Sequence, residues 1–221
     1  MEQRWYKPTR IAKGRGMRAT KAAFQEFGLL TSLVLISSVA YGSVPTPVNS
    51  IADGIWKGFT ETVLGMHHLL FTLLVGLAAY TMTKRFKSPL FYLSAVLAGS
   101  FLQRSMPLPT LVVNLGAACS LAILLLMVWF HERSRAFFPW IFLVGGWFHG
   151  LSLANEVQGS ADPGFFAVVC AAILVQSLIC FGFGRFALKL SLQSPDGFEG
   201  LENILSATAI GVAMAYVYRA F

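Results

Sequence analysis

The sequence is poor in charge and in cysteine. Only 12% of its 221 residues are Asp, Glu, Lys or Arg, whereas soluble domains contain about 25%. Its three cysteines, Cys119, Cys170 and Cys180, lie in apolar stretches without zinc-finger spacing, so we expect packing roles and no disulfide framework. A Gly-Lys-Ser/Thr nucleotide-binding loop and a His-Glu-x-x-His helix are also missing. These absences argue against a soluble domain, a disulfide-bonded scaffold and a nucleotide-driven machine.

Apolar residues dominate the chain. Hydrophobic residues make up 56% of it and aromatic residues 14%, and the mean hydropathy is +0.64. A bilayer-spanning helix needs roughly 17–25 mostly apolar residues. The sequence therefore predicts an all-α, polytopic membrane helical bundle with about six transmembrane helices. We expect them at about 58–82, 88–104, 108–130, 137–156, 164–188 and 200–219.

The basic excess is concentrated at the amino terminus. Residues 1–42 contain seven of the 17 Lys and Arg residues but only two acids, and the whole chain has a net charge of +7. An apolar run, Gly28–Val39, and the small-x-small sequence Ala40-Tyr41-Gly42 follow the basic start, which is typical of a signal peptide. We expect a signal-like segment at 1–42, a six-helix domain at 43–221 and no nucleic-acid partner. An uncleaved first helix remains the alternative, and translation could start at Met1 or at Met17.

Loop charges predict the orientation, because Lys and Arg are enriched in cytoplasmic loops. Seven basic residues lie at the end of the first, third or fifth expected span or just after it: Lys84, Arg85, Lys87, Arg133, Arg135, Arg185 and Lys189. Only three lie at the opposite ends: Lys57, Arg104 and Arg219. We therefore expect a multi-pass protein of the inner (plasma) membrane, surrounded by the lipid bilayer, whose mature amino terminus faces outward.

Three of the four histidines lie in apolar stretches. These are His67, His68 and His149, and the acids Glu61 and Glu156 each stand seven residues from one of them. An ionisable side chain at the bilayer centre costs roughly 2.5–3.5 kcal/mol on insertion scales, so such residues usually serve a function. Carboxylates attract divalent cations, and imidazole favours nickel, cobalt, copper or zinc over magnesium and calcium. The pattern therefore indicates a site for a divalent transition-metal ion.

The spacing limits how these residues can meet. Residues seven apart share a helix face but lie about 10 Å apart along the axis. Glu61 and His68 can therefore share one ion only if the helix breaks near Gly65. If the first and fourth spans are antiparallel neighbours, Glu61 comes level with Glu156 and His68 with His149. This arrangement would give a carboxylate layer and a deeper imidazole layer.

Other polar residues near the motifs have supporting roles in this interpretation. Asn155, Ser152 and Thr60 are expected to hydrogen-bond to the ligands or to hold water. A structural alternative remains open, because an intramembrane His often only bonds between helices and a Glu at a span end can reach the headgroups. Three further polar residues in or near spans are expected to link helices by hydrogen bonds: Asn114, Gln176 and Asn203.

Two segments resemble the HupE/UreJ family of nickel and cobalt permeases. That family's second motif is Phe-His-Gly-x-Ala/Val-x-Gly-x-Glu, and residues 148–156 match its Phe, His, Gly and Glu in register. Its first motif is His, five residues, then Asp-His. Here His68 matches the last position, while Glu61 and His67 replace the other two. The resemblance implies nickel or cobalt handling and a link to hydrogenase or urease maturation, with an altered first ligand set.

The sequence thus predicts a permease that imports a divalent transition-metal ion, nickel or cobalt first and zinc next, through His67, His68, His149, Glu61 and Glu156. The metal is then the substrate, and the protein is not expected to be an enzyme. An intramembrane metalloenzyme, with Glu61 as general base, remains the first alternative. A structural or assembly subunit of a membrane complex is the second. A homo-oligomer or a metalloenzyme maturation partner would be compatible with this function.

Overall fold

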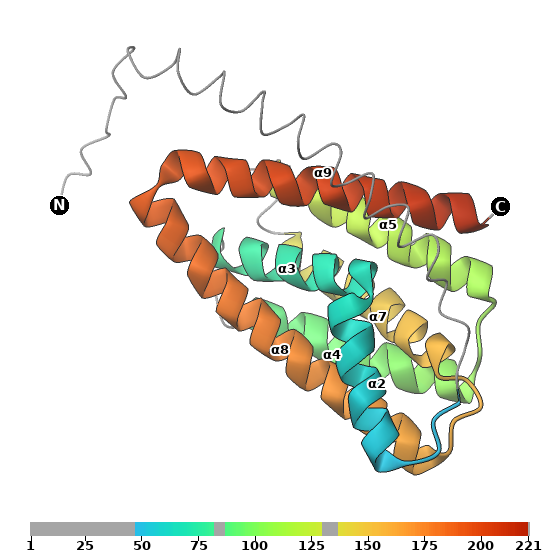
Figure 1. Ribbon diagram of the computed structural model, residues 1–221. Coiled ribbons are helices and arrows are strands. Elements are labelled where there is room, and N and C mark those ends of the chain that lie inside the picture. The colour runs from blue at the N-terminus through green and yellow to red at the C-terminus, as the bar shows by residue number, and fades with distance from the viewer. Residues whose placement is uncertain (1–46, 82–86, 130–136, 221) are drawn as a thin grey trace, which may run out of the picture.

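The computed structural model describes residues 47–81, 87–129 and 137–220, and within these ranges it is helical, with no strand. The helices are α2 (Ile51–Leu64), α3 (Met66–Thr81), α4 (Lys87–Ser105), α5 (Thr110–Trp129), α7 (Phe138–Glu156), α8 (Asp162–Gln193) and α9 (Pro195–Ala220) (Figure 1). This confirms the all-α expectation. The signal-like segment, both candidate start sites and His131 lie outside the described residues.

The first expected span consists of two helices. α2 begins earlier than expected, at Ile51, where the Ser50 hydroxyl accepts a hydrogen bond from the Asp53 N–H and caps the helix. It ends at Leu64 with Gly65 as its C-cap, and α3 continues at an angle of 70°. The span expected at 58–82 is therefore bent at Gly65, where the sequence had left a helix break open as the condition for Glu61 and His68 to share one ion.

Helix α8 runs obliquely across both halves of this bent pair (Figure 1). Where α2 crosses it, a Cβ added to Gly58 would lie 2.4 Å from the Val168 carbonyl oxygen. Where α3 crosses it, a Cβ added to Gly76 would lie 2.6 Å from the Cys180 carbonyl oxygen. Small residues thus let the helix backbones approach closely, as is common for helices packed in lipid.

Helix α7 packs mainly against α4, and α5 lies between α7 and α9. The largest apolar cluster fills the space among α3, α4, α5, α7, α8 and α9, and its fully buried members include Phe71, Leu74, Tyr92, Leu124 and Phe142. The aromatic and aliphatic side chains bury a large apolar area there and fix the helices around the polar groups described below.

One end of the bundle is fastened by hydrogen bonds. Arg104, at the end of α4, donates to the Ser160 carbonyl oxygen at 2.8 Å and pairs with Asp162 at the start of α8. The Ser160 hydroxyl in turn accepts a bond from the Val48 N–H at 2.7 Å. These contacts join the segment before α2, the end of α4 and the turn between α7 and α8.

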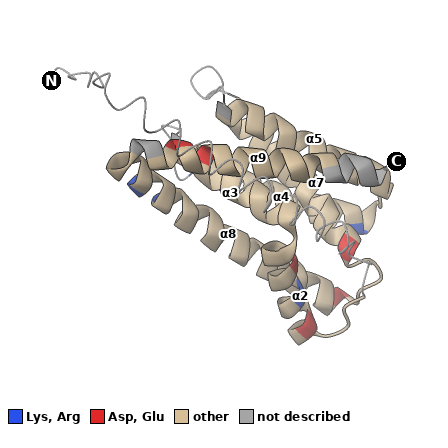
Figure 2. Cartoon of the chain, turned by 45° about the horizontal axis from the view of Figure 1, so that its top comes forward, with Lys and Arg blue, Asp and Glu red and all other residues tan. Residues whose placement is uncertain are grey.

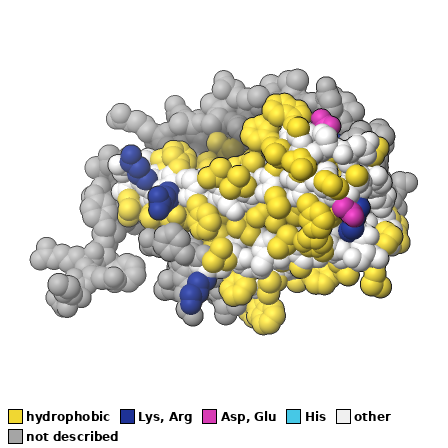
Figure 3. Space-filling model, turned by 90° about the horizontal axis from the view of Figure 1, so that it is seen from below, with side chains coloured by type: hydrophobic (Ala, Val, Ile, Leu, Met, Phe, Trp, Pro, Cys, Tyr) yellow, Lys and Arg dark blue, Asp and Glu magenta, His cyan; other side chains and the backbone are white. Residues whose placement is uncertain are grey.

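The described helices form a membrane protein. α5 and α8 are each long and apolar enough to cross a bilayer, and the bent pair α2–α3 passes the same test as one unit. α7 does not pass, and it carries His149, Asn155 and Glu156. The number six thus remains a prediction. Charged side chains gather at two opposite ends (Figure 2), and a broad apolar surface separates them on the face in Figure 3.

Candidate metal centre

The first turn of α3 places two imidazoles side by side at the helix bend. His67 and His68 are the second and third residues of α3, after Gly65 and Met66, and their ring centroids are 3.9 Å apart. Both side chains are buried. A Cβ on Gly65 would lie 2.1 Å from the Glu61 carbonyl oxygen and 3.2 Å from Cδ2 of His68. Glycine is therefore required where the chain turns against the His68 ring.

Glycines also bring α7 close enough to deliver a third imidazole. A Cβ on Gly150 would lie 2.1 Å from the Val96 carbonyl oxygen of α4, and one on Gly145 would lie 2.1 Å from Cζ of Phe71 on α3. The neighbouring His149 is 0% exposed. α3 and α7 meet in opposite directions, since His68 lies near His149 and Phe71 near Gly145.

The three imidazoles form one cluster. A ligand nitrogen from each of His67, His68 and His149 lies within 4.8 Å of the other two. Nδ1 of His68 and Nδ1 of His149 are 3.4 Å apart. Two nitrogens bound to one tetrahedral ion at about 2.0–2.1 Å lie about 3.3–3.4 Å from each other. The cluster therefore has the donor set and the scale of a transition-metal site.

A carboxylate completes the cluster on one side. Oε2 of Glu156, the last residue of α7, is 3.8 Å from Nε2 of His68. Nε2 of His68, Nε2 of His149 and Oε2 of Glu156 are all buried without a hydrogen-bond partner among the described residues. Buried polar atoms are normally satisfied, because leaving them unpaired is unfavourable. A divalent cation or its water ligand between Nε2 of His68 and Oε2 of Glu156, which are 3.8 Å apart, would satisfy this pair, so these two residues fit such an ion.

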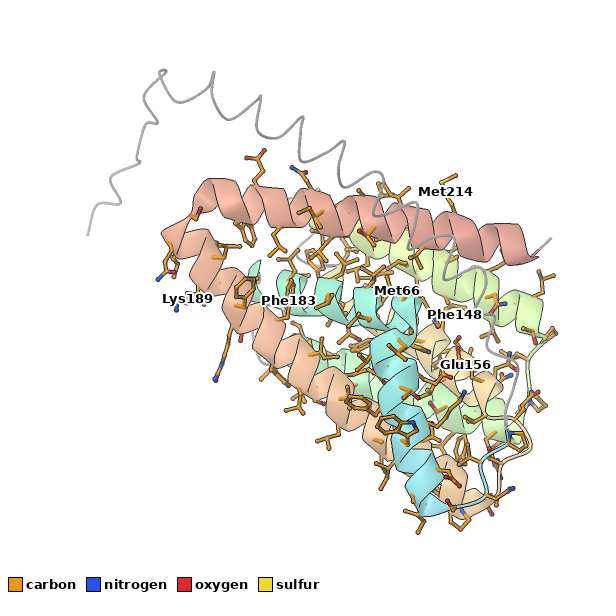
Figure 4. The ribbon with its side chains drawn as sticks, viewed as in Figure 1. Met66, Phe148, Glu156, Phe183, Lys189 and Met214 are labelled. Atoms are coloured by element: carbon orange, nitrogen blue, oxygen red, sulfur yellow. The ribbon has the colours of Figure 1, made fainter. Side chains whose placement is uncertain are left out.

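The second carboxylate approaches the first from the other helix. Glu61 lies near the end of α2, and its carboxyl group interacts with that of Glu156. The same carboxylate forms an ion pair with Lys57, one turn earlier on α2. Figure 4 shows Glu156 on α7 near the start of α3, where Met66 lies, and far from Lys189 on α8. The structure thus brings both acids to the side of the imidazole cluster where α7 ends.

The three supporting residues expected from the sequence behave differently from one another. Ser152 lies 3.2 Å from Nε2 of His67, so its hydroxyl is hydrogen-bonded to the imidazole. The Asn155 side chain instead donates to the Thr110 hydroxyl of α5. The Thr60 hydroxyl donates to backbone carbonyls of its own helix. In the described part of the chain, these bonds of Asn155 and Thr60 therefore lead away from the imidazoles.

Sequence reasoning did not identify the residues that orient the imidazoles. The Phe71 ring lies 4.2 Å from that of His149, centroid to centroid. The Thr72 hydroxyl donates to the His68 carbonyl oxygen at 2.7 Å, and the buried Tyr92 hydroxyl lies 3.2 Å from Thr72. Since the Thr72 proton is already used, Tyr92 is the donor of this bond. The only signal in the sequence was helical spacing, because Phe71 and Thr72 follow His68 by three and four residues.

Comparison with known proteins agrees with the motifs at this centre. The comparisons with curated proteins and with solved structures find no match. A family model described as HupE / UreJ protein matches residues 16–216, which include both histidine-bearing segments. The chain therefore belongs to the HupE/UreJ family.

Proposed function

We propose that this protein is a permease that carries a divalent transition-metal ion, nickel or cobalt first, across the inner membrane. The observation that carries the proposal is the buried cluster of His67, His68 and His149, whose ligand nitrogens lie within 4.8 Å of one another beside Glu156. Membership of the HupE/UreJ family, which is generally linked to nickel or cobalt transport or to urease or hydrogenase maturation, supports it. In this proposal the metal is the substrate, and the protein is not an enzyme.

The order of the groups suggests a path. Glu61 and Glu156 would attract a hydrated cation where α7 ends, and the imidazoles would then replace part of its water. Imidazole nitrogen selects nickel, cobalt, copper and zinc over magnesium and calcium. The end of α7 faces outward in this proposal, so entry is inward. A potential of 100 mV, negative inside, favours a divalent cation by about 4.6 kcal/mol, twice the value for a single charge.

Uptake into vesicles tests this function. The full-length protein is reconstituted, and nickel or cobalt entry is followed under an inside-negative potential. We expect His68→Ala and His149→Ala to abolish uptake, because each removes a ligand of the cluster. Ser94→Ala is the matched control, since that hydroxyl bonds only to its own helix in an exposed position. Normal uptake by both histidine variants, at equal incorporation, would refute the proposal.

The alternative function, an intramembrane metalloenzyme that uses the same cluster, predicts a different experimental result. A metalloenzyme would keep its ion, so the purified wild-type protein would retain a stoichiometric metal and show no uptake. A permease would lose its bound ion when the purified protein is washed with chelator, and it would transport newly added ion after reconstitution. Assembly of this protein into a homo-oligomer, and its interaction with a metalloenzyme maturation partner, remain predictions from the sequence.

A further inference from the structure

The amide of Gln176 is buried in α8 without a hydrogen-bond partner. The side chain is 0% exposed, and neither Oε1 nor Nε2 has a partner among the described residues. Among the described residues, the hydrogen bonds between helices that the sequence predicts for Gln176 are therefore not formed. Burying an amide with neither atom bonded is unfavourable, so this position requires a bound partner or a function.

Gln103 shows how a buried glutamine is satisfied elsewhere in this protein. It is 2% exposed, its Nε2 donates to the Leu108 carbonyl oxygen at 3.1 Å, and its Oε1 accepts from the Leu108 N–H at 3.0 Å. That amide closes the turn between α4 and α5. The two glutamines thus share burial and chemistry, but within the described residues Gln103 has hydrogen-bond partners and Gln176 has none.

The position of Gln176 follows from the helix crossings. Gly58 of α2 contacts Ala172 of α8, four residues before Gln176, and Gly76 of α3 contacts Cys180, four residues after it. Ala172, Gln176 and Cys180 lie on one face of α8, and all three are 0% exposed. The amide therefore faces the bent pair between its two crossings, where α2 ends and α3 begins.

The pairing of residues between α3 and α8 shows how far the Gln176 amide lies from the imidazoles. Gly76 lies against Cys180, and Tyr80 lies against Gly184, so α3 and α8 run in the same direction. One turn back, Gln176 comes level with residues 69–72, the turn that follows His68. From the carboxylates, the imidazoles come first and the Gln176 amide lies about one turn, roughly 5 Å, further on.

We propose that Gln176 is a further binding step on the ion path, where its amide holds the water of a hydrated divalent cation after the imidazoles. The amide oxygen accepts a hydrogen bond from a metal-bound water, and the amide nitrogen donates to a second water. A neutral amide suits this step, because it stabilises a hydrated cation and does not bind it as tightly as a carboxylate would. This inference rests on the proposed transport function and adds a residue outside both histidine segments.

Replacement of the two glutamines by leucine tests the inference. Full-length wild type, Gln176→Leu and Gln103→Leu are each compared for thermal stability, for equilibrium nickel binding in detergent and for nickel uptake into vesicles. We expect Gln176→Leu to keep or raise the melting temperature, since it removes an unpaired amide, and Gln103→Leu to lower it. Gln176→Leu should bind nickel as the wild type does but transport it about tenfold more slowly. Gln176→Met, closer in length, provides the same readout if the leucine variant does not fold.

The outcomes separate this inference from the function on which it rests. Uptake by Gln176→Leu equal to that of the wild type overturns the role of Gln176 and leaves the transport function standing. A loss of stability like that of Gln103→Leu, with a proportional loss of uptake, also overturns it, because the amide is then structural. No uptake by the wild type above protein-free vesicles overturns both. Normal binding with slow uptake, in a stable Gln176→Leu variant, supports it.

Discussion

Lys57 holds a positive charge within one helical turn of a carboxylate that the proposed ion must reach. The side chains of Lys57 and Glu61 are only 20% and 14% exposed, so their ion pair is poorly screened. Lys before Glu at this spacing is the less favourable order for an isolated helix. The pair therefore adds little to helix stability, and its main effect is to neutralise Glu61 beside Glu156.

Replacing Lys57 by Met should make the entrance more attractive to cations. A divalent ion would no longer compete with the ammonium group for Glu61, so we expect half-saturation of uptake at a nickel concentration about threefold lower. Lys87→Met, at the exposed start of α4, is the matched control. Concentration dependence of vesicle uptake measures the effect. An unchanged half-saturating concentration would show that Lys57 does not compete with the ion.

At the residue scale, the sequence located the ionisable groups but not their partners. Intramembrane His and Glu stand out because they are costly in lipid, so His67, His68, His149 and the acids could be selected without coordinates. Helical spacing gives the face on which a residue lies, and it does not give the helix that this face meets. Ser152 and Asn155 had the same expected role, but Ser152 is hydrogen-bonded to His67, whereas Asn155, three residues later, is hydrogen-bonded to Thr110 of α5.

At the scale of helices, the sequence predicted positions well and connections poorly. The span expected at 137–156 is the helix Phe138–Glu156, and the one expected at 88–104 is Lys87–Ser105. The break at Gly65 was considered only as a condition, because its cause is a local close approach to Glu61 and not hydropathy. The structure shows that Gly146 and Gly150 of α7 meet α4 and that Gly145 meets Phe71 of α3, which the sequence alone does not reveal.

This close packing of α7 makes a prediction. Gly150→Ala should force α7 away from α4, because the new Cβ would lie 2.1 Å from the Val96 carbonyl oxygen. We expect a loss of about 1–3 kcal/mol in stability, as for other overpacked cores, and weaker nickel binding because His149 is adjacent. Gly182→Ala is the control, since nothing lies within 4 Å of a Cβ there. Thermal unfolding and nickel titration in detergent measure both effects. Equal stability of the two variants would contradict this account of the packing.

At the scale of the whole molecule, charge and polarity are segregated. Charged side chains occupy two ends of the bundle (Figure 2), and an apolar surface lies between them (Figure 3). The imidazole cluster is enclosed within the bundle, with all three histidines buried. The all-helical class followed from composition alone. The number of membrane crossings did not, since α4, α7 and α9 are each too polar or too charged to be recognised as spans, and in α7 the polar residues include those of the proposed site.

Metal binding should stabilise the entire bundle, because the ligands come from two helices that separate on unfolding. A ligand at 100 times its dissociation constant adds about 2.7 kcal/mol to the free energy of unfolding. We expect nickel, and not magnesium, to raise the melting temperature of the wild type. His149→Ala should show no such rise. A rise of equal size in His149→Ala would place the stabilising ion elsewhere in the protein.

The two nitrogens that lie 3.4 Å apart belong to residues separated by 81 positions in the chain. During synthesis, His67 and His68 therefore leave the ribosome long before their counterpart exists. A nascent chain that has inserted only its first half therefore lacks the third imidazole of the cluster. In the proposed function, an ion can be captured only after α7 has docked, so an incomplete copy would not compete with complete ones for the metal.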